Sequence, residues 1–137
     1  MTTVEPPCNA ASGLPDSASA ARGRVRALLA TQVPLLEGES PLDERTVADI
    51  LLVTSELVTN AIQHAGGVTD FAVTVADGSL WVTVGDASDR HPARSAQAGW
   101  GRPGGYGWPL ICSVAEEVTV RPRPGGGKCV SARVRLT

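Results

Sequence analysis

Ser55-Glu56-Leu57-Val58-Thr59-Asn60-Ala61-Ile62-Gln63-His64-Ala65 is the stretch that decides the fold, because it sets polar side chains on one stripe of an otherwise apolar helix. Glu56, Asn60 and Gln63 stand at positions i, i+4 and i+7, which share a helix face. The apolar positions are Val47, Ile50, Leu51, Leu57, Val58, Ala61 and Ile62. A carboxylate and an amide one turn apart can hold a divalent cation and a polarised water. An isolated pair of this kind is more often part of a solvated helix face. Whether Glu56 and Asn60 form a binding site is therefore decided by the features around them.

The composition is that of one soluble domain. The chain has 137 residues with 12 basic and 14 acidic side chains, and a length of this order buries most of its surface around one core. It has no run of Lys or Arg and only one Phe and one Tyr, so neither an electrostatic footprint for nucleic acid nor a stacking platform is present. No apolar stretch reaches about 18 residues, and Met1 to Glu5 does not resemble a signal peptide. We therefore expect a cytoplasmic protein that binds neither nucleic acid nor membrane.

The cysteines indicate no covalent or metal framework. Cys8, Cys112 and Cys129 are odd in number, widely spaced and without a CxxC pair. Such a pattern predicts reduced thiols rather than disulfides or a zinc site.

Two helices are predicted in the first half of the chain. Residues 1–13 lack periodicity and are expected to form a flexible tail, with the domain proper at 14–137. The first helix begins near Asp16 or Ser17 and runs to about residue 32. The second is predicted to have Ser40 as its cap and Pro41 at its first position, and to end before Gly66-Gly67.

Two hairpins are predicted after these helices. Residues 69–76 and 79–86 alternate apolar and polar side chains around Asp77-Gly78, a dipeptide that tolerates the positive φ of a two-residue turn. Residues 118–123 and 128–136 form a second pair around a Pro-Gly-Gly-Gly turn. The last strand places Val130, Ala132, Val134 and Leu136 on one side and Ser131, Arg133 and Arg135 on the other. One face of the sheet is thus expected to be buried and the other solvated, which predicts an α/β two-layer sandwich whose mixed, mostly antiparallel sheet carries helices on one face.

Between the hairpins lies a long loop, at about 87–106, that such a sandwich does not need. Loops of this length in compact domains are usually lids, binding loops or disordered insertions. It ends in Gly101-Arg102-Pro103-Gly104-Gly105-Tyr106-Gly107, directly before a predicted helix at 108–115. Glycine amides at a helix N-terminus can bind an anion, although a glycine-rich turn alone is more often explained by its flexibility.

Familiar phosphate, metal and hydrolase motifs are absent from the sequence. Pro122 stands where a P-loop needs glycine, and Gly105-Tyr106-Gly107 lacks the third glycine of GxGxxG. His64 and His91 have no zinc-ligand spacing and are expected on the surface. There is no GxSxG elbow.

The order of the motifs resembles a known fold family. The motifs are Glu56-Leu57-Val58-Thr59-Asn60-Ala61, Val84-Gly85-Asp86-Ala87-Ser88, Gly104-Gly105-Tyr106-Gly107 and Gly127-Lys128. They resemble the N box, the G1 box, the G2 box and the closing strand of the Bergerat ATP-binding fold, which histidine kinases, gyrase B and Hsp90-type chaperones share. The small size and the entry Leu14-Pro15-Asp16-Ser17 resemble the actinobacterial anti-sigma-factor serine/threonine kinases of the RsbW type.

The resemblance implies a role for each motif residue. Asn60 would hold Mg²⁺ through its amide oxygen, and Glu56 would act as general base. Asp86 would accept a hydrogen bond from the adenine amino group. The glycines at 104, 105 and 107 would cover the phosphates of ATP, whereas Lys128 is expected as an exposed charge at a sheet edge.

Three positions depart from the family pattern. Ser88 stands where the wider fold has glycine beside the adenine, and Cys129 stands where the family usually has Thr near the adenine. Pro109 falls in the first turn of the helix after the lid, where proline is sterically tolerated. ATP binding remains the expectation, with Ser88 and Cys129 in the cofactor-binding set.

Three functions follow as alternatives. In the first, the protein is a serine/threonine kinase that phosphorylates an anti-anti-sigma partner and sequesters a sigma factor, with a homodimer as the family habit. The second is a nucleotide-dependent or degenerate binding module without phosphotransfer, and the third is a purely structural domain. The sequence shows no sensor domain, dimerisation helix or phosphoacceptor histidine module before the fold, so a two-component histidine kinase is not expected. Glu56 favours the first function, because a pure binder has no use for a base there.

Overall fold

The computed structural model describes residues 13–32, 42–92 and 107–136. Its helices are α1 (Ala18–Gln32), α2 (Glu44–Ala65) and α4 (Gly107–Val114), and its strands are β1 (Asp70–Ala76), β2 (Ser79–Asp86), β3 (Glu117–Pro122) and β4 (Lys128–Arg135). The predicted tail up to residue 12, the predicted cap Ser40 with Pro41, and residues 93–106 of the predicted lid fall outside the described ranges. No helix of the described part is long and apolar enough to span a membrane.

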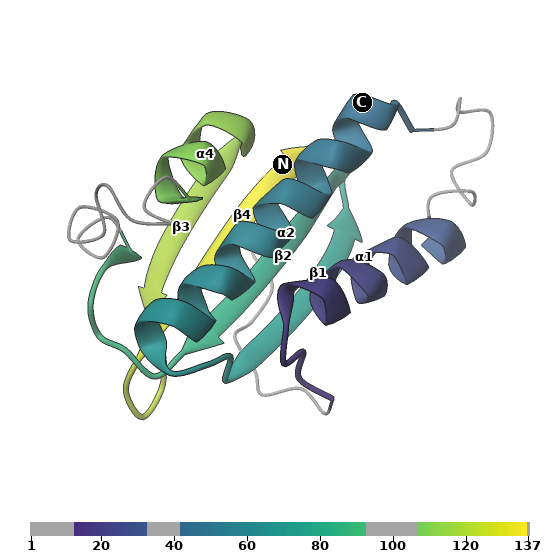
Figure 1. Cartoon of the computed structure of the whole chain (residues 1–137). Helices are drawn as coiled ribbons and strands as arrows, with labels where there is room; N and C mark the ends of the chain where they lie inside the picture. The colour runs from purple at the N-terminus through teal and green to yellow at the C-terminus, as the bar shows by residue number, and fades with distance from the viewer. Residues whose placement is uncertain (1–12, 33–41, 93–106, 137) are drawn as a thin grey trace.

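The four strands form one sheet in the order β1-β2-β4-β3, and all three pairings are antiparallel. The three helices lie together on one face of this sheet (Figure 1). The predicted α/β sandwich and both hairpins are therefore confirmed. In the first hairpin Asp77 and Gly78 have φ of 52° and 73°, the positive values that a tight two-residue turn requires.

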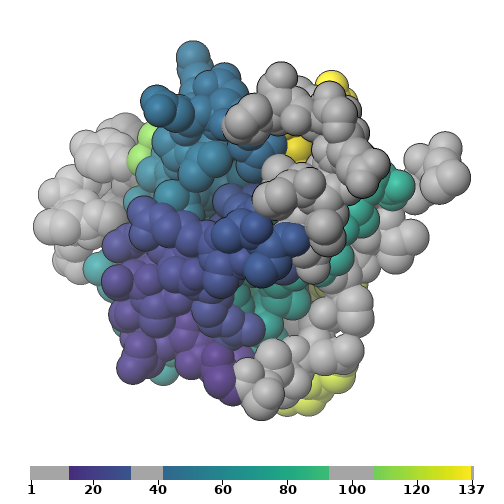
Figure 2. All heavy atoms as spheres, turned by 90° about the vertical axis from the view of Figure 1, so that its right-hand side faces the viewer, coloured from purple at the N-terminus to yellow at the C-terminus, as the bar shows by residue number. Residues whose placement is uncertain are grey.

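The helices are built by caps and by one apolar face each. Ser17 Oγ accepts a hydrogen bond from Ala20 N at 3.0 Å, and α1 then buries Ala21 and Val25 completely. Figure 2 views the molecule from the side of α1 and shows this helix packed beside the N-terminal part of α2. The core between helices and sheet consists mainly of aliphatic side chains from α1, α2, β2 and β4.

Helix α2 begins later than predicted. Asp43 is the N-cap and accepts a hydrogen bond from Arg45 N at 3.2 Å, so the predicted start at Ser40 and Pro41 is wrong. A carboxylate directly before a helical run caps as well as a serine does, and the sequence offers both. The predicted end is confirmed: Gly66 is left-handed at φ 78°, and Gly67 N donates to Ala61 O at 2.9 Å.

The second face of the sheet is solvated only in part: Arg135 is 64% exposed as predicted, but the centre of this face is buried. Every residue of β2 is buried, including Trp81 at 2% exposure, and Ser131 of β4 has no exposed surface. Thr83 and Ser131 satisfy each other across the strands through an Oγ1–Oγ distance of 2.7 Å, and the Arg133 guanidinium lies 5.9 Å from the centre of the Trp81 ring. Paired hydroxyls and a stacked guanidinium allow polar residues to be buried here, which alternation alone does not reveal.

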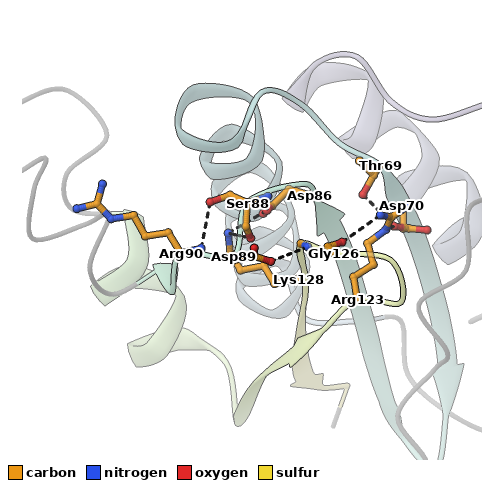
Figure 3. A network of polar contacts seen from close by, with 10 residues as sticks. Thr69, Asp70, Asp86, Ser88, Asp89, Arg90, Arg123, Gly126 and Lys128 are labelled. Carbon is orange, nitrogen blue, oxygen red and sulfur yellow. Dashed lines mark hydrogen bonds and ion pairs between the residues drawn. The ribbon is translucent and has the colours of Figure 1, made fainter.

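A partly buried ion pair ties the second hairpin to the far edge of the sheet. Arg123 Nε donates to Asp70 Oδ2 at 2.5 Å, and Thr69 Oγ1 donates to the same oxygen at 2.9 Å (Figure 3). Gly85 makes room for this carboxylate, since a Cβ there would lie 2.5 Å from Asp70 Oδ2. Arg123 also donates to Gly126 O at 3.2 Å, so the turn before β4 is held at the start of β1.

Candidate functional site

A cavity lies between α2, the ends of β2 and β4, and the start of α4. Its lining residues are Leu57, Asn60, His64, Val84, Asp86, Pro92, Trp108, Lys128 and Val130. Apolar walls with a few polar groups are typical of small-molecule sites. The cavity brings together Asn60 and Asp86, which the sequence analysis assigned to one site from positions 26 residues apart (86 − 60).

Asp86 and Lys128 form a buried ion pair in this cavity. The two residues face each other across β2 and β4, and Lys128 Nζ lies 2.9 Å from Asp86 Oδ1 and 3.3 Å from Ser88 O (Figure 3). The side chains of Lys128 and Asp86 are only 9% and 6% exposed, respectively. The expectation of an exposed edge charge is therefore wrong for Lys128. The signal was present in the sequence, because Lys128 shares its strand parity with the core residues Val130 and Ala132.

The glycine before Lys128 fixes how closely the hairpin approaches Asp86. Gly127 has φ of 86°, and a Cβ on it would overlap the carbonyl oxygen of Asp86 and lie 2.9 Å from Ala87 Cα. Gly127 N also donates to Asp89 Oδ1 at 2.8 Å. Only glycine permits both the conformation and the contact, so this position sets the geometry of the ion pair.

The second polar end of the site joins α2 to α4. Gly107, the first residue of α4, packs so closely on α2 that a Cβ would overlap Glu56 Oε2 and lie 3.5 Å from Asn60 Oδ1. Glu56 and Asn60 are both half-buried, and no hydrogen bond engages either side chain within the described residues. Burial raises the pKa of the Glu56 carboxyl above its ordinary value of 4.5. The close approach of the two helices thus groups Glu56, Asn60 and Gly107, all of which were predicted.

Comparisons with known proteins agree with this geometry. A family model for the histidine kinase-like ATPase domain matches residues 14–134. The chain belongs to this family. ATP is therefore the ligand that the family implies, and the Bergerat fold predicted from the four motifs is confirmed.

Solved histidine kinases are similar to this ATPase domain in structure. The blue-light activated histidine kinase of Erythrobacter litoralis EL346 has a TM-score of 0.52 at 25% identity, and the match covers 83% of this chain but 41% of that one. The histidine kinase domain of the same protein has a TM-score of 0.53 at 22% identity, covering 94% of this chain and 66% of that one. This chain thus spans less than two thirds of either protein. No curated protein matches the sequence.

Two predicted residues of the ATPase domain do not line the cavity. Ser88 instead builds the turn after β2: its N–H donates to Asp86 Oδ1 at 2.9 Å and its Oγ accepts from Arg90 N at 3.1 Å. Cys129 lies on the sheet face away from the helices, because its strand parity is opposite to that of Lys128 and Val130. Cys129 is also disulfide-bonded, so the expectation of a reduced thiol is wrong for this residue, whereas Cys112 is free.

His64, Pro92, Trp108 and Val130 belong to the cavity wall but were not assigned to the site from the sequence. His64 follows Asn60 by one turn and lines the cavity, although it is exposed as expected, whereas Gln63 does not line it. Trp108 lines the cavity from α4 and stacks edge-on against His91, with ring centres 5.7 Å apart. Val130 completes the wall. Gly104 and Gly105, predicted to cover phosphates, lie outside the described residues.

A cation in this site would depend on ligands from outside the protein. Within the described ranges no group of three or more His, Cys, Asp and Glu side chains could hold a metal ion. Asn60 offers one amide oxygen beside Glu56, a donor set that suits a hard cation completed by phosphate oxygens and water. Those residues therefore fit Mg²⁺ that arrives with a nucleotide.

Proposed function

We propose that this ATPase domain is a serine/threonine protein kinase of the anti-sigma factor type. It would phosphorylate an anti-anti-sigma partner and, in its other state, sequester a sigma factor, acting in the cytoplasm and as a homodimer. The observation that carries the proposal is the Glu56 carboxylate, which lies against Gly107 beside Asn60 and makes no side-chain bond in the described structure. A carboxylate held half-buried and unengaged is suited to accept a proton.

Different residues of the site would bind the adenine and the phosphates of ATP. Asp86 lies in the cavity at the end of β2, where its carboxylate can accept a hydrogen bond from the amino group of adenine. Asn60 lies between this point and the N-terminus of α4, where Asn60 Oδ1 would hold Mg²⁺ that links the phosphates to the protein. The amides at the start of α4 add the favourable end of a helix dipole.

Glu56 then serves the transfer step. Its carboxylate would take the proton from the serine or threonine hydroxyl of the partner while the oxygen of that hydroxyl forms a bond to the γ-phosphorus. The bond from the γ-phosphorus to the bridging oxygen breaks, and ADP leaves with the electron pair. Burial raises the pKa of Glu56, which makes it a stronger base than an exposed glutamate.

Two substitutions test the proposal. Asn60→Ala should weaken MgATP binding by about 2 kcal/mol or more, the size of a lost charge-assisted contact, in calorimetric titration. Gln63→Ala, which removes an exposed amide from the same helix, is the matched control. Equal MgATP affinity in Asn60→Ala and the parent would remove the metal role.

Glu56→Gln separates a kinase from a binding module. Loss of a general base typically slows a reaction by about 10² to 10⁴. Transfer of labelled phosphate to an anti-anti-sigma partner from the same host should fall by this factor, whereas MgATP affinity should stay within about threefold. Glu44→Gln, an exposed glutamate in the first turn of α2, should leave both unchanged. MgATP binding without phosphate transfer in the parent protein would support a nucleotide-gated binding module in place of a kinase.

A further inference from the structure

Lys128 is the only lysine in the sequence; the other eleven basic residues (12 − 1) are arginines. This single lysine lies inside the cavity with its side chain 9% exposed. Burying an ammonium group is costly unless it is paired, so its position calls for an explanation. The pairing with Asp86 explains part of this burial, because the two charges cancel. A neutral nucleobase can therefore cover the pair without burying a net charge.

The bonding of the pair leaves one donor and one acceptor for a ligand. An ammonium group has three N–H donors, and Lys128 uses two of them, toward Asp86 Oδ1 and Ser88 O. Asp86 Oδ1 accepts hydrogen bonds from both Lys128 Nζ and Ser88 N, whereas Asp86 Oδ2 accepts none within the described residues. Both side chains line the same cavity.

We propose that Asp86 and Lys128 read the nucleobase together, at two adjacent positions. Asp86 Oδ2 accepts a hydrogen bond from the exocyclic amino group, and Lys128 Nζ donates its third N–H to the ring nitrogen next to it. Adenine carries this order of groups, with its amino group beside the unprotonated ring nitrogen N1. Hypoxanthine and guanine carry a carbonyl oxygen and an N–H there, the reverse order. Lys128 is thereby a specificity-determining residue, and this role rests on the ATP binding proposed above.

The geometry of the hairpin favours a fixed position for the Lys128 ammonium group over a mobile one. Lys128 follows Gly127, which lies so close to the backbone of Asp86 and Ala87 that no Cβ fits there. The turn is held in addition by Asp89 on one side and by Arg123 on the other. A donor and an acceptor held at fixed positions discriminate between bases, because a wrong base leaves them without partners.

A cycle of protein and ligand variants tests the contact to N1. The ligands are MgATP and the magnesium complex of 1-deaza-ATP, in which a C–H group replaces N1. The proteins are the parent, Lys128→Met and, as control, Arg135→Met, which removes an exposed cation from the other face of the same strand. The parent and Arg135→Met should bind 1-deaza-ATP about tenfold or more weakly than ATP, the loss expected when a charged donor loses its acceptor. Lys128→Met should bind both ligands alike.

Three results would overturn the proposal while leaving ATP binding intact. The first is a parent that binds both ligands equally. The second is Lys128→Met that still prefers ATP, and the third is Lys128→Met that binds ATP more tightly than the parent does, which would make Lys128 a plug over Asp86. A parent that binds neither ligand would instead refute the proposed function itself.

A measurement on the parent protein alone covers the case in which Lys128→Met does not fold. Since Lys128 is the only lysine, reductive methylation can modify this side chain and the α-amino group, which serves as internal control. Saturating MgATP should slow methylation of Lys128 by about tenfold or more and leave the α-amino group unaffected, because the bound base occupies the third N–H. Unchanged or faster methylation of Lys128 with bound MgATP would contradict the proposed contact.

Discussion

Gly127→Ala should destabilise the fold and disturb the site together. Gly127 has φ of 86°, and a Cβ there would overlap the carbonyl oxygen of Asp86 and lie 3.1 Å from Ala87 C. A non-glycine residue in this conformation costs about 1–2 kcal/mol. Forcing an extra carbon into packed backbone costs about 1–3 kcal/mol more. The sum, roughly 2–5 kcal/mol, is a large part of the stability of about 5–15 kcal/mol of a typical domain.

Gly125 provides a matched control in the same turn. Its φ is 85°, almost identical, but a Cβ on it meets no atom within 4 Å. Gly125→Ala should therefore cost only the conformational part, about 1–2 kcal/mol. The difference between the two variants in urea unfolding isolates the contact of the hairpin with the end of β2. It corresponds to a midpoint roughly 1 M lower for Gly127→Ala. Equal midpoints for the two variants would refute the tight approach of the hairpin and with it the fixed geometry of Lys128.

Three further changes have expected outcomes. The pKa of Glu56 is raised above 4.5, so its carboxylate becomes protonated as the pH falls through the raised value. Phosphate transfer should therefore decline at a higher pH than an ordinary glutamate would give. A pH–rate profile measures this decline, and Glu56→Gln should lack it. Gly107→Ala should push the Glu56 carboxylate aside and slow transfer by about 10²-fold or more, with a smaller change in MgATP affinity by calorimetry. Asp70→Asn should cost about 1–3 kcal/mol in urea unfolding by weakening the pair between the buried Asp70 carboxylate and Arg123. Glu116→Gln, in a more exposed pair, should cost under about 1 kcal/mol.

Much of the fold could be predicted because its signals are local. The Asp-Gly turn, the glycines after α2 and the alternation of the strands each depend on residues within a few positions of one another. The start of α2 could not be predicted, because Ser40 and Asp43 are both acceptable caps and the choice between them depends on packing. The burial of Trp81 and Ser131 could not be predicted for a related reason, since their partners Arg133 and Thr83 belong to neighbouring strands.

The motif residues of the candidate site could be predicted from the sequence, but the ion pair between Asp86 and Lys128 could not. The order of the motifs around Glu56, Asn60 and Asp86 is specific enough to indicate the family from the sequence alone. The ion pair between Asp86 and Lys128 depends on which strands are neighbours in the sheet. No local sequence signal shows that β4 lies beside β2. Parity within β4 would have placed Lys128 toward the cavity and Cys129 away from it, but the residue types suggested the reverse.

The position of β4 has a consequence for how the protein is made. It is the last of the four strands in the chain, yet it lies between β2 and β3 and carries the lysine of the ion pair. The ribosome must therefore deliver the chain as far as Arg135 before the centre of the sheet can be filled, and until then β2 is paired with β1 only. Contacts between segments far apart in sequence also make folding slow. Until β4 is added, the nascent chain contains Asn60 and Asp86 but lacks Lys128, so the ion pair of the binding site forms only when the sheet is completed.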